Sequence, residues 1–428
     1  MKNNLLLLFG LLLYRVTLDA AYPVISKYYV CSGMIITDKA MPWILSWAIF
    51  LYSIPMIVKL WNKNTPYSII ICTLYLCGFV PVTSLFMYID PAPGFVYTFL
   101  LYWSVLLFAS LLIPDIKIPE IKYNRDYSIF LYAFALLIGA VVLYTPWRVR
   151  GLSFHFDLST VYELRRDANL MNMNGMQKRL LALANKTLPI ITVYFLWRKK
   201  WGWFIGLFII SLLNFGIAGH KTVLFTIILS LTFYWGYRDW MWKYIPAALA
   251  FLNFAGIFLL DCFGIIELIS YSTRRIFFLP PLLNYCYYDY FNTKGPDYYL
   301  SGIVGKIVKI PSEHAQDISH TIGEIYFNAP QMGANNGLYS DAFANLGATG
   351  CIILPLLLCF CIFMLQYFGR NLPIKVLFSV VIVYSITFIS SFLPTIFLTH
   401  GLAIVYILFC LMSSAKKGGT AVQYEQCK

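Results

Sequence analysis

Apolar stretches dominate the pattern of hydrophobic and polar positions along the chain, and most of them extend over roughly 20 residues. A helix of that length crosses the hydrocarbon core of a bilayer, so these stretches predict membrane-spanning helices. We place about twelve spans, at residues 4–22, 42–58, 67–89, 94–113, 127–145, 179–197, 201–217, 220–236, 244–263, 347–368, 374–392 and 395–412. The pattern therefore predicts an all-α integral membrane protein with a single polytopic membrane domain over residues 1–428.

Two long polar stretches, residues 146–178 and 264–345, interrupt this pattern. Four of the predicted spans lie between them, so both stretches should face the same side of the membrane. Loops of this size indicate a reaction at the membrane surface, on a substrate that is part lipid and part polar. A pump or channel, in contrast, works at the bilayer midplane and places its polar residues there.

The short connections carry a strong charge bias. Sixteen lysines and arginines fall in the termini and short loops on one side, against three in the short loops on the other side. Because cytoplasmic loops are enriched in these residues, both termini should be cytoplasmic and both long polar loops should lie outside. The net charge of +13 then reflects membrane orientation in large part and indicates no nucleic-acid partner. With 60% hydrophobic and 12% charged residues, the composition excludes a soluble domain.

The first span has two interpretations. Leu5–Leu13 resembles the core of a signal peptide, but no clear cleavage site of small residues follows it. Arg15 and Asp19 lie four residues apart and share one helical face. We therefore expect a retained first helix with an internal ion pair.

Cysteine and histidine spacing indicates no metal or cofactor. Most of the 10 cysteines lie inside predicted spans, and no CxxC motif or evenly spaced framework occurs outside them. His314 lies beside Glu313, but no recognised metal-ligand spacing surrounds the pair. We expect no structural disulfide, no metal site and no cofactor.

The first polar stretch contains candidate ligand-binding cations. Residues 160–163 form a capping box that should start a short helix. On that helix Arg165 flanks the apolar stripe, whereas Arg166 points away from it and can pair with Glu163. Arg165 should face protein or ligand, although a snorkelling arginine on an interfacial helix remains equally open. Lys221, in the Gly-His-Lys-Thr segment, opposes the charge bias and could bind either a lipid-linked phosphate or outer headgroups.

The second polar stretch carries an arginine pair and an aromatic run. Arg274 and Arg275 would diverge by about 100° on a helix, so both reach one ligand only if they straddle it. A diphosphate suits that arrangement, because guanidinium groups bind phosphate oxygens in pairs. Tyr288 belongs to an aromatic run that could stack on sugars or form an interfacial belt. Residues 298–310 resemble a helix lying in the membrane interface.

The end of this stretch contains candidate acid–base residues. His320 and Glu324 share a face if helical, so the carboxylate could orient and polarise the imidazole. Asn335 or Asn336 could cap the following helix. Asp341 lies inside that helix, where capping does not explain it, and Asn345 faces the same way four residues later.

Together these features resemble the Wzy-type O-antigen or exopolysaccharide repeat-unit polymerases of Gram-negative bacteria. The resemblance covers the whole architecture and includes the segments 162–165 and 219–222, the Arg274-Arg275 pair with its prolines, and the segment 322–347. The chain departs from the family pattern where Asn336 replaces the expected threonine, which weakens Asn336 as a functional candidate.

The resemblance implies a GT-C-like membrane glycosyltransferase of the bacterial inner membrane with a periplasmic active site. Its substrates would be undecaprenyl-diphosphate-linked oligosaccharide repeat units, and its partners would be membrane lipids, a chain-length regulator and a flippase. Arg165, Lys221, Arg274 and Arg275 would meet the diphosphate, and Asn335 and Tyr288 would also bind substrate. His320 is the first candidate for the general base, with Glu324 orienting it and Asp341 in reserve.

Three other functions compete with this interpretation. An O-antigen ligase uses the same donor but a lipid A-core acceptor, and the sequence separates the two poorly. A polysaccharide flippase or transporter would place charges deep in several spans, where Arg15, Asp19 and Lys186 are among the few here. A non-enzymatic scaffold would not need arginine-rich outer loops on a body of about twelve spans.

Overall fold

The computed structural model describes residues 2–30, 33–113, 126–150, 175–218, 221–312, 314 and 317–415, and over these residues the chain is helical with no strand. The all-α prediction is therefore confirmed for this part of the chain. The elements are α1 (Lys2–Tyr28), α2 (Trp43–Lys63), α3 (Pro66–Leu74), η2 (Tyr75–Phe79), α4 (Val80–Leu85), α5 (Pro93–Leu112), α6 (Ser128–Arg150), α8 (Gly175–Trp197), α9 (Trp201–Ala218), α10 (Lys221–Gly236), η3 (Asp239–Tyr244), α11 (Ile245–Phe263), α12 (Glu267–Ile269), η4 (Ser270–Phe278), α13 (Leu279–Lys294), α14 (Ile303–Val308), α15 (Ile318–Phe327), α16 (Tyr339–Gly369), α17 (Ile374–Ser390), α18 (Leu393–Leu398) and α19 (Leu402–Ser414).

Eight helical segments in the described part are long and apolar enough to cross a membrane, and four shorter apolar helices accompany them. Each predicted span overlaps one of these twelve segments. Helices of this length and composition are typical of an integral membrane protein. An α-helix satisfies its own backbone hydrogen bonds in hydrocarbon, where no water is present to do so. The crossing of the membrane by all twelve segments, and the GT-C-like fold, stay predictions.

Several of the apolar segments are interrupted. A π-helical stretch, η2, joins α3 to α4 just before Pro81, a residue that lacks an N–H donor and disturbs the preceding turn. Within α16, Gly347 has φ 60° and ψ −143°, which breaks the helix into a short first segment and a long apolar one. Gly401, with φ 73°, separates α18 from α19. The break at Gly347 coincides with the predicted start of that span.

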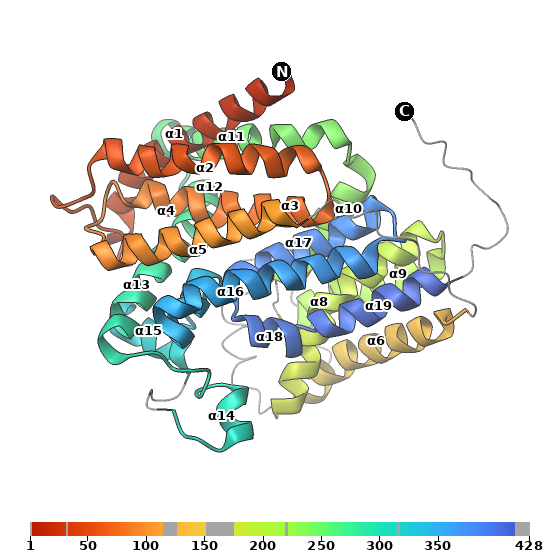
Figure 1. The fold of residues 1–428 in the computed structure, drawn as a ribbon. Helices are drawn as coiled ribbons and strands as arrows, with labels where there is room; N and C mark the ends of the chain where they lie inside the picture. Colours follow the sequence, from red (N-terminus) through yellow and green to blue (C-terminus); the bar gives the residue numbers. More distant parts are fainter. Residues whose placement is uncertain are drawn as a thin grey trace. The chain divides into compact units, whose positions relative to one another are not determined.

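The chain divides into two compact units, each described here by itself. The first comprises residues 1–115, 237–363 and 384–396, and the second comprises residues 116–236, 364–383 and 397–428. In the first unit α1 packs along α11, and α2 to α5 follow in sequence (Figure 1). In the second unit α6, α8 and α9 pack on one another.

The second polar stretch folds into helices of the first unit. Elements α12, η4, α13, α14 and α15 follow one another through residues 267–327. The predicted interfacial helix at 298–310 is shorter than expected, since α14 extends only over Ile303–Val308. Of the first polar stretch, residues 151–174 lie outside the described residues.

Candidate functional site

The arginine pair lies in the π-helical element η4 of the first unit. The guanidinium carbon of Arg274 lies 4.2 Å from the centre of the Tyr29 ring, an attractive cation–π geometry. Tyr29 is itself held, because its hydroxyl donates a hydrogen bond of 2.8 Å to Ser270 Oγ one turn before the arginine. Arg275, next in the chain, is exposed. Arg274 is therefore stacked on a protein side chain, whereas Arg275 is exposed to the surroundings of the protein.

Arg274 also has an unsatisfied donor. Its Nε atom is buried and has no hydrogen-bond partner in the structure. A buried N–H group without a partner is unfavourable and is normally satisfied by protein, water or ligand. Guanidinium groups bind phosphate oxygens through such N–H groups, so this position suits an oxyanion.

Asp341 is the centre of a buried polar cluster at the start of α16, where its side chain is 2% exposed. Its carboxylate accepts hydrogen bonds from Tyr299 Oη at 3.0 Å, Asn345 Nδ2 at 2.9 Å and the Leu393 backbone N–H at 2.5 Å. Burial and the neighbouring Asp341 carboxylate raise the pKa of Tyr299, which keeps its hydroxyl protonated as a donor. Asp341 and Asn345 do face the same way, as their spacing of four predicted.

A small pocket adjoins this cluster. It is lined by Asp341, Tyr102, Ser391 and apolar side chains of the first unit, and its volume is about 10 Å³. That volume is close to what one water molecule needs. The space beside the carboxylate has room for a water molecule but not for a sugar.

His320 pairs with a different carboxylate from the one expected. Its Nδ1 atom lies 3.3 Å from Asp317 Oδ2, and the two side chains are 49% and 63% exposed. Asp317 is the N-cap of α15 and also accepts a hydrogen bond from the Ser319 N–H. The structure thus gives the orienting position to Asp317 rather than to Glu324, which is exposed. With Nδ1 beside a carboxylate, Nε2 is left to accept a proton.

The two neighbouring asparagines have opposite environments. Asn335 is exposed, whereas Asn336 is 3% exposed. The Asn336 amide donates to Pro280 O at 3.0 Å, Asn284 Oδ1 at 2.9 Å and Ser340 Oγ at 2.9 Å. Asn336 therefore joins the helix that follows the arginine pair to the helix that carries Asp341, although its departure from the family pattern had weakened it as a candidate.

Tyr288 belongs to the packed interior of the first unit. Its side chain is 7% exposed, and the centre of its ring lies 4.8 Å from the ring centre of Phe343 and 5.5 Å from that of Phe95. Tyr287 and Phe291 of the same run are also buried. Sugar stacking on Tyr288 would require this packing to open.

The structure does not describe the side chains of the two remaining predicted cations. Arg165 lies outside the described residues, and Lys221 begins α10 with a side chain that is not described. Their convergence with the arginine pair stays a prediction.

Hydrogen bonds connect the candidate segments of the first unit. The Ala334 N–H donates to Ser319 O at 3.0 Å, which ties the turn before Asn335 to the residue before His320. Tyr287 Oη donates to Ala334 O at 3.0 Å, so α13 holds the same turn. Together with the Asn336 contacts, these bonds bring the segments of Arg274, His320 and Asp341 into one connected structure.

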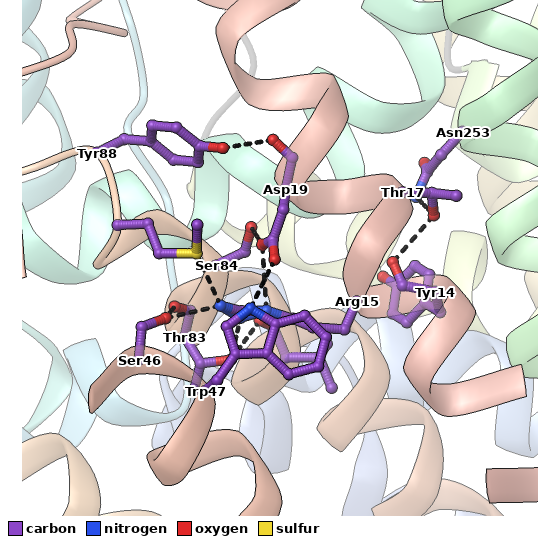
Figure 2. Close-up of polar contacts among 12 residues, drawn as sticks. Tyr14, Arg15, Thr17, Asp19, Ser46, Trp47, Thr83, Ser84, Tyr88 and Asn253 are labelled. Carbon is purple, nitrogen blue, oxygen red and sulfur yellow. Dashed lines mark hydrogen bonds and ion pairs between the residues drawn. The ribbon is translucent and has the colours of Figure 1, made fainter. Parts of the chain in front are cut away.

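A second buried polar network surrounds Arg15, which is fully buried in α1 (Figure 2). Its guanidinium donates to Asp19 Oδ1 at 3.1 Å, Thr83 Oγ1 at 3.1 Å and Ser46 Oγ at 2.6 Å. The predicted internal ion pair is confirmed. Each of its three nitrogens donates to a group inside the protein, so this network is a structural clamp between α1, α2 and α4.

The clamp also reaches the arginine-bearing element. Tyr88 donates to the Asp19 carbonyl oxygen at 2.5 Å and stacks on Tyr22 with ring centres 4.8 Å apart. Tyr22 in turn meets Phe278, at the end of η4, with ring centres 5.0 Å apart. The sequence suggested the ion pair but not these partners.

Sequence reasoning missed Asp317, Tyr299 and Tyr29. Asp317 could have been found, because an aspartate three residues before His320 is a typical N-cap. Tyr29 and Tyr299 have no local signal, since each contacts its partner across a long separation in the chain. Among the described residues, no group of three or more His, Cys, Asp and Glu side chains is placed to hold a metal ion.

No protein-family model, curated protein or solved structure matches the chain.

Proposed function

We propose that the chain is an O-antigen (lipopolysaccharide) polymerase. It would transfer the growing glycan from undecaprenyl diphosphate to a sugar hydroxyl of an incoming lipid-linked repeat unit. The observation that carries the proposal is the Arg274 guanidinium, held on the Tyr29 ring with a buried Nε that has no partner. A cation fixed in this way is prepared for an oxyanion.

The reaction exchanges one C–O bond for another. The acceptor hydroxyl oxygen attacks the anomeric carbon of the donor sugar, and the bond from that carbon to the diphosphate oxygen breaks. The electron pair leaves with the diphosphate, so negative charge grows where Arg274 and Arg275 would bind. Cations positioned there stabilise the transition state more than the ground state. Arg165 and Lys221 would add to this charge.

The acceptor proton goes to a base, and His320 fits this role best. Asp317 beside Nδ1 supports a tautomer with Nε2 as the acceptor, and the side chain is half exposed and thus accessible. Asp341 is the reserve candidate, but its carboxylate already accepts three hydrogen bonds. A diphosphate leaves without protonation, so one base suffices.

Substitution of the arginines tests the diphosphate site. Losing one charge-assisted contact costs about 1.5–3 kcal/mol, or roughly 10- to 150-fold in rate. Arg274→Ala and Arg275→Ala should therefore shorten the O-antigen chains at unchanged protein levels, and lysine should rescue only partly because it lacks the planar fork. Lys294→Ala removes an exposed cation at the end of α13 and is the matched control. Normal O-antigen chain lengths in both arginine variants would show that this pair does not bind the diphosphate.

Purified protein with lipid-linked repeat units tests the base. His320→Ala should abolish polymerisation while donor binding persists, and Asp317→Asn should slow it. Activity should survive a chelator, since arginines and not a divalent ion would meet the phosphate charge. If His320→Ala polymerises normally and Asp341→Asn does not, the base is Asp341. Loss of activity on chelation would refute the metal-free mechanism.

The proposed location is the bacterial inner membrane, with both termini cytoplasmic and the site periplasmic. Reporter fusions near residues 165 and 300 should be active with a periplasmic enzyme such as alkaline phosphatase. Activity of a cytoplasmic reporter at either point would overturn this orientation.

The lipopolysaccharide of a deletion strain separates the polymerase from an O-antigen ligase, which would use the same diphosphate-binding arginines. Core with a single repeat unit indicates a polymerase, whereas bare core indicates a ligase.

A further inference from the structure

The loop of residues 297–312, which lies between α13 and α15 and contains the short helix α14, exposes several large apolar side chains. Ile307 is 72% exposed, Val308 is 48% exposed and Ile310 is 53% exposed. Tyr298, near the start of the loop, is 58% exposed. Lys309 lies among these residues and is also exposed. Contiguous apolar side chains beside a lysine are typical of a segment that contacts a bilayer surface.

The base of the 297–312 loop is closed by Asp297, which is 2% exposed. Its carboxylate accepts hydrogen bonds from the Ser301 N–H at 3.0 Å, Ser301 Oγ at 2.7 Å and Ser312 Oγ at 2.5 Å. Both ends of the loop are thus tied to one buried carboxylate. The apolar residues Ile307, Val308 and Ile310, called the tip below, are therefore held by a fixed connection to the rest of the first unit.

This base is attached to α16 just before its long apolar part. The Asp297 N–H donates to Ala344 O at 2.8 Å, and the Tyr298 N–H donates to Asn345 O at 3.0 Å. Both acceptors lie within three residues of Gly347, where the apolar segment begins. A helix rises 1.5 Å per residue, so these two contacts lie within about 5 Å, measured along α16, of the start of its long apolar part.

The bend into the loop is strained and held by the Asp341 cluster. Tyr298 and Tyr299 have φ of 53° and 61°, a left-handed conformation that is rare for aromatic residues. The Tyr299 N–H donates to Asn345 Oδ1 at 3.1 Å and its hydroxyl donates to Asp341. Strain of this kind persists only where the surroundings enforce it.

We propose that the 297–312 loop is a lipid anchor. Its tip, Ile307, Val308 and Ile310, inserts among phospholipid acyl chains next to the start of the apolar part of α16, and Lys309 meets the anionic headgroups. The loop is then held at two places, by the membrane at its tip and by the Asp341 cluster where it joins the first unit. The anchor goes beyond the proposed polymerase activity and does not depend on it.

A fluorescent non-natural amino acid at position 307 tests the anchor in the full-length protein. The protein is placed in nanodiscs of phosphatidylcholine and phosphatidylglycerol, with and without bromine on the acyl chains. Bromine quenches only a probe that lies among the chains. The same probe at Ile353, 45% exposed on α16, is the control inside the bilayer, and at Glu324, exposed on α15, it is the control outside.

The expected result is quenching at position 307 comparable to that at position 353, with little quenching at position 324. A probe at position 307 that is no more quenched than the one at position 324 would overturn the anchor. Quenching at position 324 as strong as that at position 353 would show that the assay does not distinguish this loop from the rest of the outer surface, and would overturn the assignment to this loop. Position 310 provides a second probe site in the same tip and must agree with position 307.

Discussion

Replacing Arg15 with methionine would remove the cation of the buried clamp while keeping a side chain of similar length. The guanidinium is fully buried and donates to Asp19, Thr83 and Ser46. In Arg15→Met the Asp19 carboxylate would keep only Ser84 Oγ, at 2.6 Å, and Trp47 Nε1, at 3.2 Å, as donors. A buried charge without its counter-ion typically costs about 3–5 kcal/mol of stability.

A double substitution separates the loss of the cation from the orphaned anion. In Arg15→Met/Asp19→Asn neither charge remains, and the amide that replaces the carboxylate would still offer an oxygen to Ser84. Because replacing a buried pair is often close to neutral, the double variant should be more stable than Arg15→Met alone. The coupling free energy between the two positions should be at least about 2 kcal/mol.

Unfolding of the purified protein by heat and by denaturing detergent, followed by the fraction that remains monomeric, provides the measurement. Thr17→Val is the matched control, since Thr17 lies on the same helix and its uncharged hydroxyl donates to Tyr14 O, at 2.9 Å, and accepts from Asn253 Nδ2, at 3.4 Å. It should lose about 1 kcal/mol. The reasoning is refuted if Arg15→Met is no worse than Thr17→Val, or if the double variant loses the full sum of the two single losses.

Two further pairs of variants test the packing around the candidate site. Asn336→Ala should destabilise by about 1–3 kcal/mol, because it leaves buried partners unsatisfied, whereas Asn335→Ala should change stability by less than about 0.5 kcal/mol; equal effects in thermal unfolding would contradict the assigned environments. Gly337→Ala should prevent correct folding, because the added Cβ would overlap two carbonyl oxygens of the 388–391 segment, whereas Gly206→Ala meets open space and should be neutral or slightly stabilising. A monodisperse Gly337→Ala protein with normal thermal stability would show that this close approach does not exist.

Local spacing predicted some contacts of the candidate site and not others. The separation of four between Arg15 and Asp19 predicted an ion pair that the structure contains. The same separation placed Asp341 and Asn345 on one helical face, where the structure shows a hydrogen bond between them. The same rule favoured Glu324 as the partner of His320, yet Asp317 occupies that position. A helix brings both i−3 and i+4 neighbours near a side chain, so spacing alone could not decide between them.

The hydrophobic pattern by itself determined that the chain is helical and where nearly every apolar helix lies, because a span in hydrocarbon must satisfy its own backbone and be long enough to cross. It could not reveal which distant side chains meet. Tyr29 lies under Arg274, Tyr299 reaches Asp341, and Asn336 joins two helices only through the packing of α1, α13 and α16. Tertiary structure decided these contacts, because a buried polar group takes its partner from whichever helix packs against it.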